Sequence, residues 1–510
     1  MTFNFKSKLI VFFIFYFLFR ILIFNINSAE WGDSYRILRA TNFLEKGSYP
    51  KDEKRPPLFS AFLTLIPNTL DPVFGARLLM TFVSIVTVYA FYLVILNSNL
   101  NFSENQKFLS LILFAFNPLF VYWSMRVYAD TFFLMICLFS FVLYFQILKE
   151  NSIFKLLLLS FLAFFGIMTR FEGYILVSAI FLGFIYEFIF KRKIKTLLNL
   201  LIFLILGFAL FFTAINTPWT FFKNPISSSY VDEAGRRTVG LYDILGYFLH
   251  VFFVLGNLFT CYFIFYSKNS LLKFVKENFI LFVFLGIELV LAFIWPAAVP
   301  RLLVQIVPIL ILLLVNGYEF FKVEKKSSYF YFFPLAILVY IFGQFLIKSQ
   351  FLLTNYFFMA FIILFSLIQF FLIYKKKYKF FEYSLILGTI VWMGFFIYLH
   401  KDIYKVLNNG VQYFSKEYKN DGIIVTNDVS ALTKFYFADN LKYLREVDFG
   451  IDIEKYLRDR NARYIIVTNE HNPNMEFTAS KYPYLETIYE QREEVNGKKF
   501  FIVISKVNLK

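Results

Sequence analysis

The chain reads Trp31-Gly-Asp-Ser-Tyr-Arg-Ile-Leu-Arg-Ala40, then Gly47-Ser-Tyr-Pro50 and Arg55-Pro-Pro-Leu-Phe59, in the one long polar segment of its hydrophobic first half. Apolar runs near residues 8–26 and 73–97 flank this segment, and each is long enough to cross a bilayer as a helix. Residues 27–72 therefore form a loop outside the membrane. A connection of this length is typically either functional or disordered.

The loop has the sequence pattern of a folded segment. Side chains that could share one helix face recur at Tyr35, Leu38, Thr41 and Leu44. Gly47 stands where such a helix would end. We therefore predict an amphipathic helix along the membrane surface, with Asp33 at its start and Arg55 shortly after its end.

The composition is that of a polytopic membrane protein. Of the 510 residues, 59% are hydrophobic, and the mean hydropathy of +0.62 exceeds that of ordinary soluble domains. The net charge of +16 does not indicate a nucleic-acid-binding protein, because the Lys and Arg clusters lie mostly in short loops between apolar runs.

Apolar runs of spanning length predict about thirteen transmembrane helices. They lie near residues 8–26, 73–97, 107–122, 131–148, 154–168, 173–190, 196–216, 244–266, 278–295, 301–319, 329–347, 351–374 and 382–399. We therefore expect a polytopic α-helical domain over residues 1–399, with the external loop at 27–72.

The basic residues predict the orientation in the cell membrane. If the N-terminus is cytoplasmic, dense clusters such as Lys191-Arg-Lys-Ile-Lys195 and Lys375-Lys-Lys-Tyr-Lys379 fall in cytoplasmic loops. An odd number of spans then places residues 400–510 outside the cytoplasm. The same alternation places the loop 27–72, and every other turn with candidate site residues, on the outer side.

Residues 400–510 read as a small α/β domain. We predict strands at 422–427, 442–447 and 463–469, helices at 429–437 and 453–460, and a hairpin of 485–495 with 498–507. No Gly-rich phosphate loop opens either helix, which argues against a nucleotide-binding domain. Two strands end in Thr-Asn, at Thr426-Asn427 and Thr468-Asn469, which fits turn and cap residues better than a ligand crevice.

The pattern of Gly32-Asp-Ser-Tyr35, a helix ending Gly47-Ser-Tyr-Pro50, and Arg55-Pro-Pro-Leu-Phe59 resembles the first external loop of the GT-C membrane glycosyltransferases. The nearest branch holds the protein O-mannosyltransferases and the lipid A aminoarabinose transferases. Those enzymes take a sugar from a polyprenyl phosphate and place it on an acceptor at the outer face of the membrane. The resemblance implies that Asp33 is the catalytic carboxylate and that Arg55, which stands where some relatives have Lys, contacts the lipid phosphate. Taken alone, Asp33 also fits an N-cap residue.

Asp130 is a second acidic candidate. It follows Arg126 by four residues, which fits a surface ion pair on one helical turn. The resemblance instead implies a site residue beside the catalytic carboxylate. No cofactor is certain, but Asp33 and Asp130 are the residues that would hold a divalent metal if the enzyme uses one.

The turn Thr169-Arg-Phe-Glu-Gly173 matches a Thr-Arg-x-Glu-Gly turn common in GT-C proteins. The resemblance implies that Arg170 and Glu172 help to form the donor pocket. Charged residues at an outer helix end also fit the lipid headgroup region without any site role.

Two further candidates lie later in the chain. Arg301 resembles the arginine that contacts lipid phosphate in the same superfamily, and a guanidinium suits phosphate by its geometry and permanent charge. Interfacial snorkelling explains Arg301 equally well. Glu288 lies inside an apolar run, where a carboxylate usually faces a cavity or a partner; it either lines the site or neutralises Arg20.

These features predict a glycosyltransferase whose donor is a sugar on polyprenyl or dolichyl phosphate and whose acceptor is a protein, lipid or glycan. Asp33 would take the acceptor's proton in a single inverting displacement, while Arg55 and Arg301 stabilise the departing lipid phosphate. Two alternatives stay open: a transporter or lipid flippase, and a non-catalytic membrane scaffold with an external binding domain. Transporters often show paired broken helices, which this sequence does not indicate.

Overall fold

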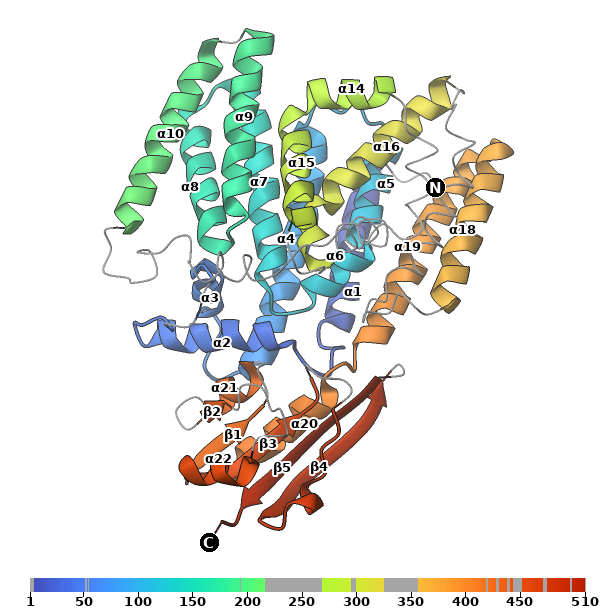
Figure 1. Cartoon of the computed structure of the whole chain (residues 1–510). Coiled ribbons are helices and arrows are strands. Elements are labelled where there is room, and N and C mark those ends of the chain that lie inside the picture. The colour runs from blue at the N-terminus through green and yellow to red at the C-terminus, as the bar shows by residue number, and fades with distance from the viewer. Residues whose placement is uncertain are drawn as a thin grey trace. The chain divides into compact units, whose positions relative to one another are not determined.

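The computed structural model describes residues 4–50, 53, 55–192, 194–215, 268–294, 300–324, 356–418, 421–427, 431–437, 441–443, 452–470, 475–495 and 498–509 (Figure 1). The chain packs into two compact units. Unit 1 comprises Met1–Ile23, Lys51–Phe62 and Leu78–Ile397, and unit 2 comprises Phe24–Pro50, Leu63–Arg77 and Tyr398–Lys510.

Unit 1 is helical. Its elements, some of which extend into unit 2, are α1 (Phe5–Ile23), α3 (Leu58–Leu63), α4 (Pro72–Asn97), α5 (Glu104–Ala115), α6 (Pro118–Ser124), α7 (Ala129–Glu150), α8 (Ile153–Thr169), α9 (Gly173–Lys191), α10 (Ile194–Ile215), α14 (Lys268–Glu277), α15 (Phe279–Ile294), η3 (Pro300–Ile306), α16 (Val307–Glu324), α18 (Tyr356–Tyr374) and α19 (Tyr378–His400). Among the described residues, six helices are long and apolar enough to cross a membrane, or seven if one bent pair forms a single span.

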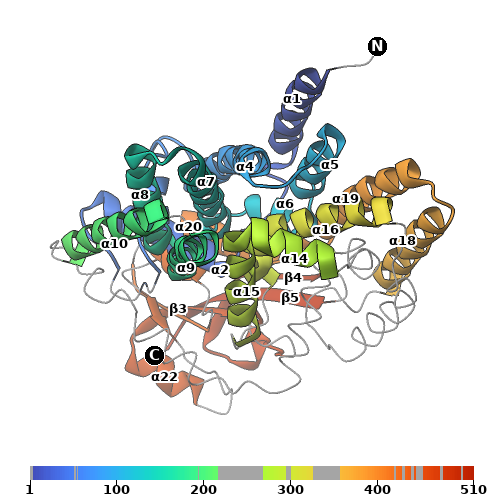
Figure 2. The same cartoon turned by 90° about the horizontal axis from the view of Figure 1, so that it is seen from above.

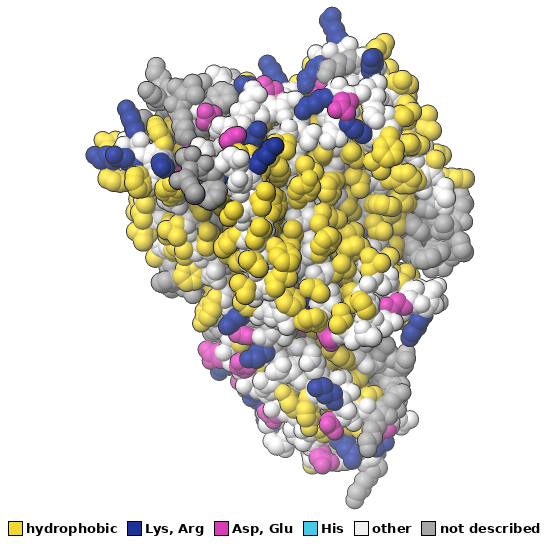
Figure 3. All heavy atoms as spheres, turned by 180° about the vertical axis from the view of Figure 1, so that it is seen from behind, with side chains coloured by type: hydrophobic (Ala, Val, Ile, Leu, Met, Phe, Trp, Pro, Cys, Tyr) yellow, Lys and Arg dark blue, Asp and Glu magenta, His cyan; other side chains and the backbone are white. Residues whose placement is uncertain are grey.

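The helices of unit 1 bring together elements from distant parts of the sequence. Helices α7 to α10 pack side by side, α15 lies against α9, and η3 lies against α7 and α15 (Figure 2). Hydrophobic side chains form a broad band over this unit, and Lys and Arg side chains gather at one end of the band (Figure 3). A multi-pass membrane protein has this distribution of apolar and basic side chains.

The predicted span 107–122 is wrong as a single straight helix. Helices α5 and α6 are bent by 51° at the break between them. Asn117 caps α6, because its Oδ1 accepts hydrogen bonds from Leu119 N and Phe120 N, and Pro118 occupies the first turn. An Asn cap followed by Pro is a typical helix start, so a new helix begins here.

Most other predicted spans in the described regions correspond to observed helices, with ends shifted by a few residues. The predicted span 301–319 begins as the 3₁₀ helix η3 before it continues as α16. The predicted spans 244–266 and 329–347 lie outside the described residues, so the count of about thirteen stays a prediction.

Unit 2 contains the predicted loop helix as α2 (Gly32–Glu45). Gly47 has a φ of +71°, a left-handed conformation that favours glycine, so the predicted end of the helix is confirmed. Helix α2 packs on α21 (Ala431–Phe437). Tyr35 Oη donates a 2.8 Å hydrogen bond to Asn408 Oδ1 in α20 (Lys405–Glu417), a helix that we did not predict.

The C-terminal part of unit 2 is a five-stranded sheet with the order β2-β1-β3-β5-β4. Its elements are β1 (Ile423–Thr426), β2 (Leu441–Tyr443), α22 (Ile453–Asp459), β3 (Ala462–Thr468), β4 (Leu485–Val495) and β5 (Lys498–Val507). Strand β1 pairs in parallel with β2 and β3, whereas β5 pairs antiparallel with β3 and β4. The predicted α/β character and hairpin are therefore confirmed.

The asparagines of the two Thr-Asn strand ends form hydrogen bonds with neighbouring segments of the sheet. Asn427 Nδ2 donates to Thr468 O at 2.7 Å, and Thr468 N donates to Asn427 Oδ1 at 2.8 Å. Asn469 Nδ2 donates to Lys499 O at 2.7 Å, and Phe501 N donates to Asn469 Oδ1 at 2.9 Å. These amides link neighbouring segments, which supports the structural interpretation over a ligand crevice.

Candidate active site

The carboxylate of Asp130 is the centre of a buried charged cluster in unit 1. Asp130 is the second residue of α7, and its side chain is fully buried. Its Oδ1 lies 2.5 Å from Nη1 of Arg170 and 3.7 Å from Nε of Arg301. The alternative of a surface ion pair with Arg126 is therefore wrong, since Asp130 is buried and pairs with arginines from distant parts of the chain.

Arg170 and Glu172 reach the cluster from the tight turn between α8 and α9. Arg170 has an extended backbone just after α8, and its Nε donates to Glu172 Oε2 at 3.1 Å, while its Nη2 pairs with Glu172 Oε1. Gly173 begins α9, and a Cβ there would clash with the backbone of Ile167 and Gly166. The Thr-Arg-Phe-Glu-Gly sequence thus needs its glycine for the close approach of two helices.

Glu172 is held in its charged form. Burial raises the pKa of Glu172, but the Arg170 charge, its hydrogen bonds and a smaller contribution from Arg301 outweigh burial and leave the pKa below its ordinary value. Arg170 thus joins two carboxylates, those of Asp130 and Glu172. A guanidinium suits this position because its donors diverge in one plane.

Arg301 lies in η3 with 18% of its side chain exposed. Its guanidinium carbon is 4.6 Å from the ring centroid of Tyr128 and 5.8 Å from that of Trp123. Stacking on aromatic rings orients a guanidinium and leaves its edge for hydrogen bonding. Arg126 is oriented in the same manner, with its guanidinium carbon 4.8 Å from the ring centroid of Tyr122.

Glu288 completes the cluster from α15. It is buried, and it lies within electrostatic range of Glu172, Arg170 and Asp130. Among the described residues, no group bonds its Oε1. The alternative that Glu288 neutralises Arg20 is not supported, because Arg20 Nη2 donates instead to the Ser124 carbonyl at 3.0 Å.

The structure therefore brings together five of the seven predicted site residues from four segments: Asp130, Arg170, Glu172, Glu288 and Arg301. Three carboxylates and two guanidiniums lie in a largely buried environment, where charge interactions are stronger than in water. Such an arrangement can hold an anionic group at a guanidinium while the carboxylates fix the positions of the arginines.

Asp33 lies in unit 2, as the second residue of α2. The helix begins at Gly32 with Trp31 as its N-cap, so the interpretation of Asp33 as the N-cap is wrong. A carboxylate in the first turn is still stabilised by the helix dipole. Asp33 is partly exposed, whereas its neighbours Ser34 and Tyr35 are buried.

An ion pair that we did not predict from the sequence fixes the start of α2. Arg77 Nε donates to Glu30 Oε1 at 2.6 Å, and Ser34 Oγ donates to Glu30 Oε2 at 3.1 Å. Both charged side chains are almost fully buried. An arginine near the start of a long apolar run was a usable signal for a buried partner. By contrast, no sequence feature marked Tyr128 and Trp123 as the rings beside Arg301.

Arg55 lies in unit 1, shortly before α3. Its Nη1 donates to Glu53 Oε1 at 3.0 Å, and 19% of its side chain is exposed. Within the described ranges, no group of three or more His, Cys, Asp or Glu side chains could hold a metal ion. The phosphate contact of Arg55 and the metal at Asp33 and Asp130 therefore stay predictions.

The chain resembles known proteins both in sequence and in fold. Residues 54–219 match the family model for dolichyl-phosphate-mannose-protein mannosyltransferase. The crystal structure of ArnT from Cupriavidus metallidurans bound to undecaprenyl phosphate aligns with a TM-score of 0.64 and 10% sequence identity, over 99% of this chain and 98% of that chain. The apo state of ArnT aligns with a TM-score of 0.61 and 10% identity, over 98% of each chain. No curated protein matches the chain.

These findings confirm the resemblance to GT-C membrane glycosyltransferases and the predicted fold. The segment that matches the family model contains Arg55, Asp130, Arg170 and Glu172, whereas Asp33, Glu288 and Arg301 lie outside it.

Proposed function

We propose that this chain, a multi-pass membrane protein with the fold of the GT-C glycosyltransferases, moves a sugar from a polyprenyl-phosphate-linked donor to an acceptor at the outer face of the membrane. The observation that carries the proposal is the buried cluster around Asp130, because three of its members lie in the segment that matches a mannosyltransferase family. The ArnT structure with undecaprenyl phosphate supports a lipid phosphate as carrier of the sugar.

In this proposal, Arg301 contacts the phosphate of the donor. Its side chain is partly exposed and stacked on Tyr128, so its orientation is set before the lipid arrives. Arg170 acts as a positioning residue, because it is paired with both Asp130 and Glu172. Glu288 and Glu172 line the same region, and Arg55 supplies a second guanidinium for the phosphate.

Asp33 is the proposed general base. It accepts the proton of the acceptor hydroxyl while the acceptor oxygen forms a bond to the anomeric carbon of the sugar. The bond from that carbon to the phosphate oxygen breaks on the opposite face, so the configuration inverts. The electron pair leaves with the polyprenyl phosphate, whose growing charge the arginines stabilise. A protein, lipid or glycan can supply the hydroxyl.

Asp130 does not fit a divalent cation in this arrangement. Two guanidinium groups lie within 4 Å of its carboxylate, and they would repel a second cation at short range. The arginines therefore stabilise the leaving phosphate in this proposal.

Donor consumption by Asp33→Asn tests the proposal. The purified full chain in lipid is given a radiolabelled polyprenyl-phosphate sugar with a mixture of membrane acceptors, and release of the lipid phosphate is measured. General-base catalysis contributes roughly a hundred- to ten-thousand-fold, so the variant should bind donor normally and turn it over at least about a hundredfold more slowly. Asp459→Asn, on the exposed end of α22, is the matched control and should retain full turnover.

Two results would count against the proposal. If Asp33→Asn and Asp459→Asn turn over donor at the same rate, Asp33 is not the base. If the native chain binds the lipid phosphate but consumes no sugar donor, a transporter or flippase becomes the better interpretation.

A further inference from the structure

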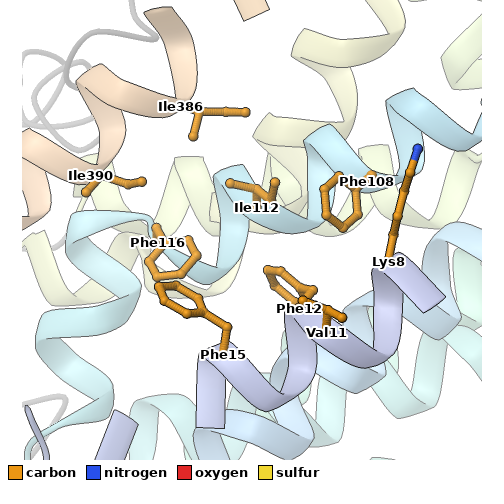
Figure 4. A pocket seen from close by; sticks show the side chains of 9 residues that line it. All are labelled: Lys8, Val11, Phe12, Phe15, Phe108, Ile112, Phe116, Ile386 and Ile390. Carbon is orange, nitrogen blue, oxygen red and sulfur yellow. The ribbon is translucent and has the colours of Figure 1, made fainter. Parts of the chain in front are cut away.

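A groove with apolar walls lies between α1, α5 and α19 of unit 1 (Figure 4). Its volume is about 380 Å³, within the usual range for small-molecule sites. Phe12 and Phe116 form a buried floor, whereas Phe15 and Ile390 at the rim are 59% and 38% exposed. The groove is therefore accessible from the side, where lipid surrounds a membrane-spanning helix.

One end of this groove is basic. Among the described residues, Lys8 is the only charged side chain that lines the groove, and Figure 4 shows its ammonium group pointing away from the apolar residues, beside Phe108. The labelled residues follow the same order along all three helices, so α1, α5 and α19 begin at this end. Their first four residues carry Lys6, Lys8, Lys107 and Lys379, against one acidic residue, Glu104.

We propose that the groove binds one anionic phospholipid, with an acyl chain between α1, α5 and α19 and the headgroup phosphate on the Lys8 ammonium. The apolar walls accommodate the acyl chain, because hydrocarbon tails pack against apolar side chains through van der Waals contacts. Charge complementarity accounts for the headgroup, because the Lys8 ammonium at the groove and the helix N-termini beside it favour a negative charge. This binding site is separate from the cluster around Asp130 and does not depend on the transferase proposal.

The charge of Lys8 predicts how strongly the groove should prefer an anionic phospholipid over a zwitterionic one. A basic residue near an anionic membrane surface contributes on the order of a fivefold change in binding. Phosphatidylglycerol should therefore bind about five times more tightly than phosphatidylcholine with the same acyl chains, because only the headgroup charge differs.

Native mass spectrometry of the full chain, released from detergent with either lipid, measures this ratio directly. Lys8→Gln should reduce the ratio to near one. Lys6→Gln is the matched control, since Lys6 lies in the same helical turn but does not line the groove. Ile386→Trp should fill the groove and weaken the binding of both lipids. The melting temperature of each variant identifies any that fails to fold.

Three results would overturn the proposal. Equal affinity of the native chain for both lipids would show that the site does not select charge. Equal loss of preference in Lys8→Gln and Lys6→Gln would indicate general surface electrostatics. Unchanged lipid binding by a folded Ile386→Trp variant would place the lipid elsewhere.

Discussion

Replacing Arg170 with Gln should destabilise unit 1 strongly, because the change leaves two carboxylates without their main counter-charge. Arg170 lies 2.5 Å from Asp130 and also pairs with Glu172. Asp130 is fully buried, and the side chains of Arg170 and Glu172 are only 13% and 12% exposed. Removing one partner from a buried ion pair costs about 3–5 kcal/mol, and we expect a loss in this range.

A second variant separates the cost of leaving two carboxylates unpaired from the cost of lost packing. In the triple variant Arg170→Gln with Asp130→Asn and Glu172→Gln, no charge of the three remains, and the two added changes replace each carboxylate by an amide of the same shape. Replacing all partners of a buried polar interaction by neutral groups is far less costly than removing one. The triple variant should therefore be more stable than Arg170→Gln alone, which additive effects of three destabilising changes would not produce.

The assay is thermal unfolding of the purified chain in one fixed detergent and lipid mixture at pH 7, followed by tryptophan fluorescence. Arg458→Gln is the control, because Arg458 makes an exposed ion pair with Glu454 four residues away, worth at most about 1 kcal/mol. If Arg170→Gln lowers the melting temperature no more than Arg458→Gln does, the cluster does not depend on this ion pair. A triple variant less stable than Arg170→Gln would also refute the reasoning.

Three further predictions concern the same cluster. Gly173→Ala should lower the melting temperature markedly, because a Cβ clashes with the Ile167 backbone, whereas Gly207→Ala, with open space around it, should be neutral or slightly stabilising. Since Arg170 and hydrogen bonds hold the pKa of Glu172 below its ordinary 4.5, the charged form favours the folded state. That stability is present above pH 4.5 and is lost as the pH falls through the lowered pKa, so acid unfolding curves should be shallower in Glu172→Gln. Arg301→Gln should weaken binding of the polyprenyl-phosphate donor by roughly ten- to a hundredfold, as measured by lipid-phosphate binding, with a smaller effect on melting temperature than Arg170→Gln; unchanged binding would remove Arg301 from the phosphate site.

The elements that sequence analysis located well are those with a local cause. Apolar runs located the helices because only a long hydrophobic helix satisfies its backbone within a membrane. Gly47 marked the end of α2 because its positive φ favours glycine, and the Asn496-Gly497 turn sequence located the hairpin of β4 and β5. The bend at Asn117-Pro118 was also a local signal, and it was overlooked because the apolar run continues across it.

The candidate site could be found only in part. The sequence and its family resemblance selected each candidate separately: Asp130, Arg170, Glu172, Glu288 and Arg301. For each of them, the sequence also allowed an interpretation without a site role. Position along the chain could not decide between Arg126 and Arg170 as the partner of Asp130, because four-residue spacing favours the local pair whatever the rest of the fold does. Packing of η3 on α7 and of α15 on α9 brings the distant charges close together.

The sequence by itself determined a multi-pass helical membrane protein with a small α/β part, because the length of an apolar run and the residues of a turn are properties of local segments. The tertiary structure alone decided which charges meet. Burial makes an unpaired charge costly, so helices that carry opposite charges pack where those charges can pair, and that choice depends on the whole bundle of unit 1.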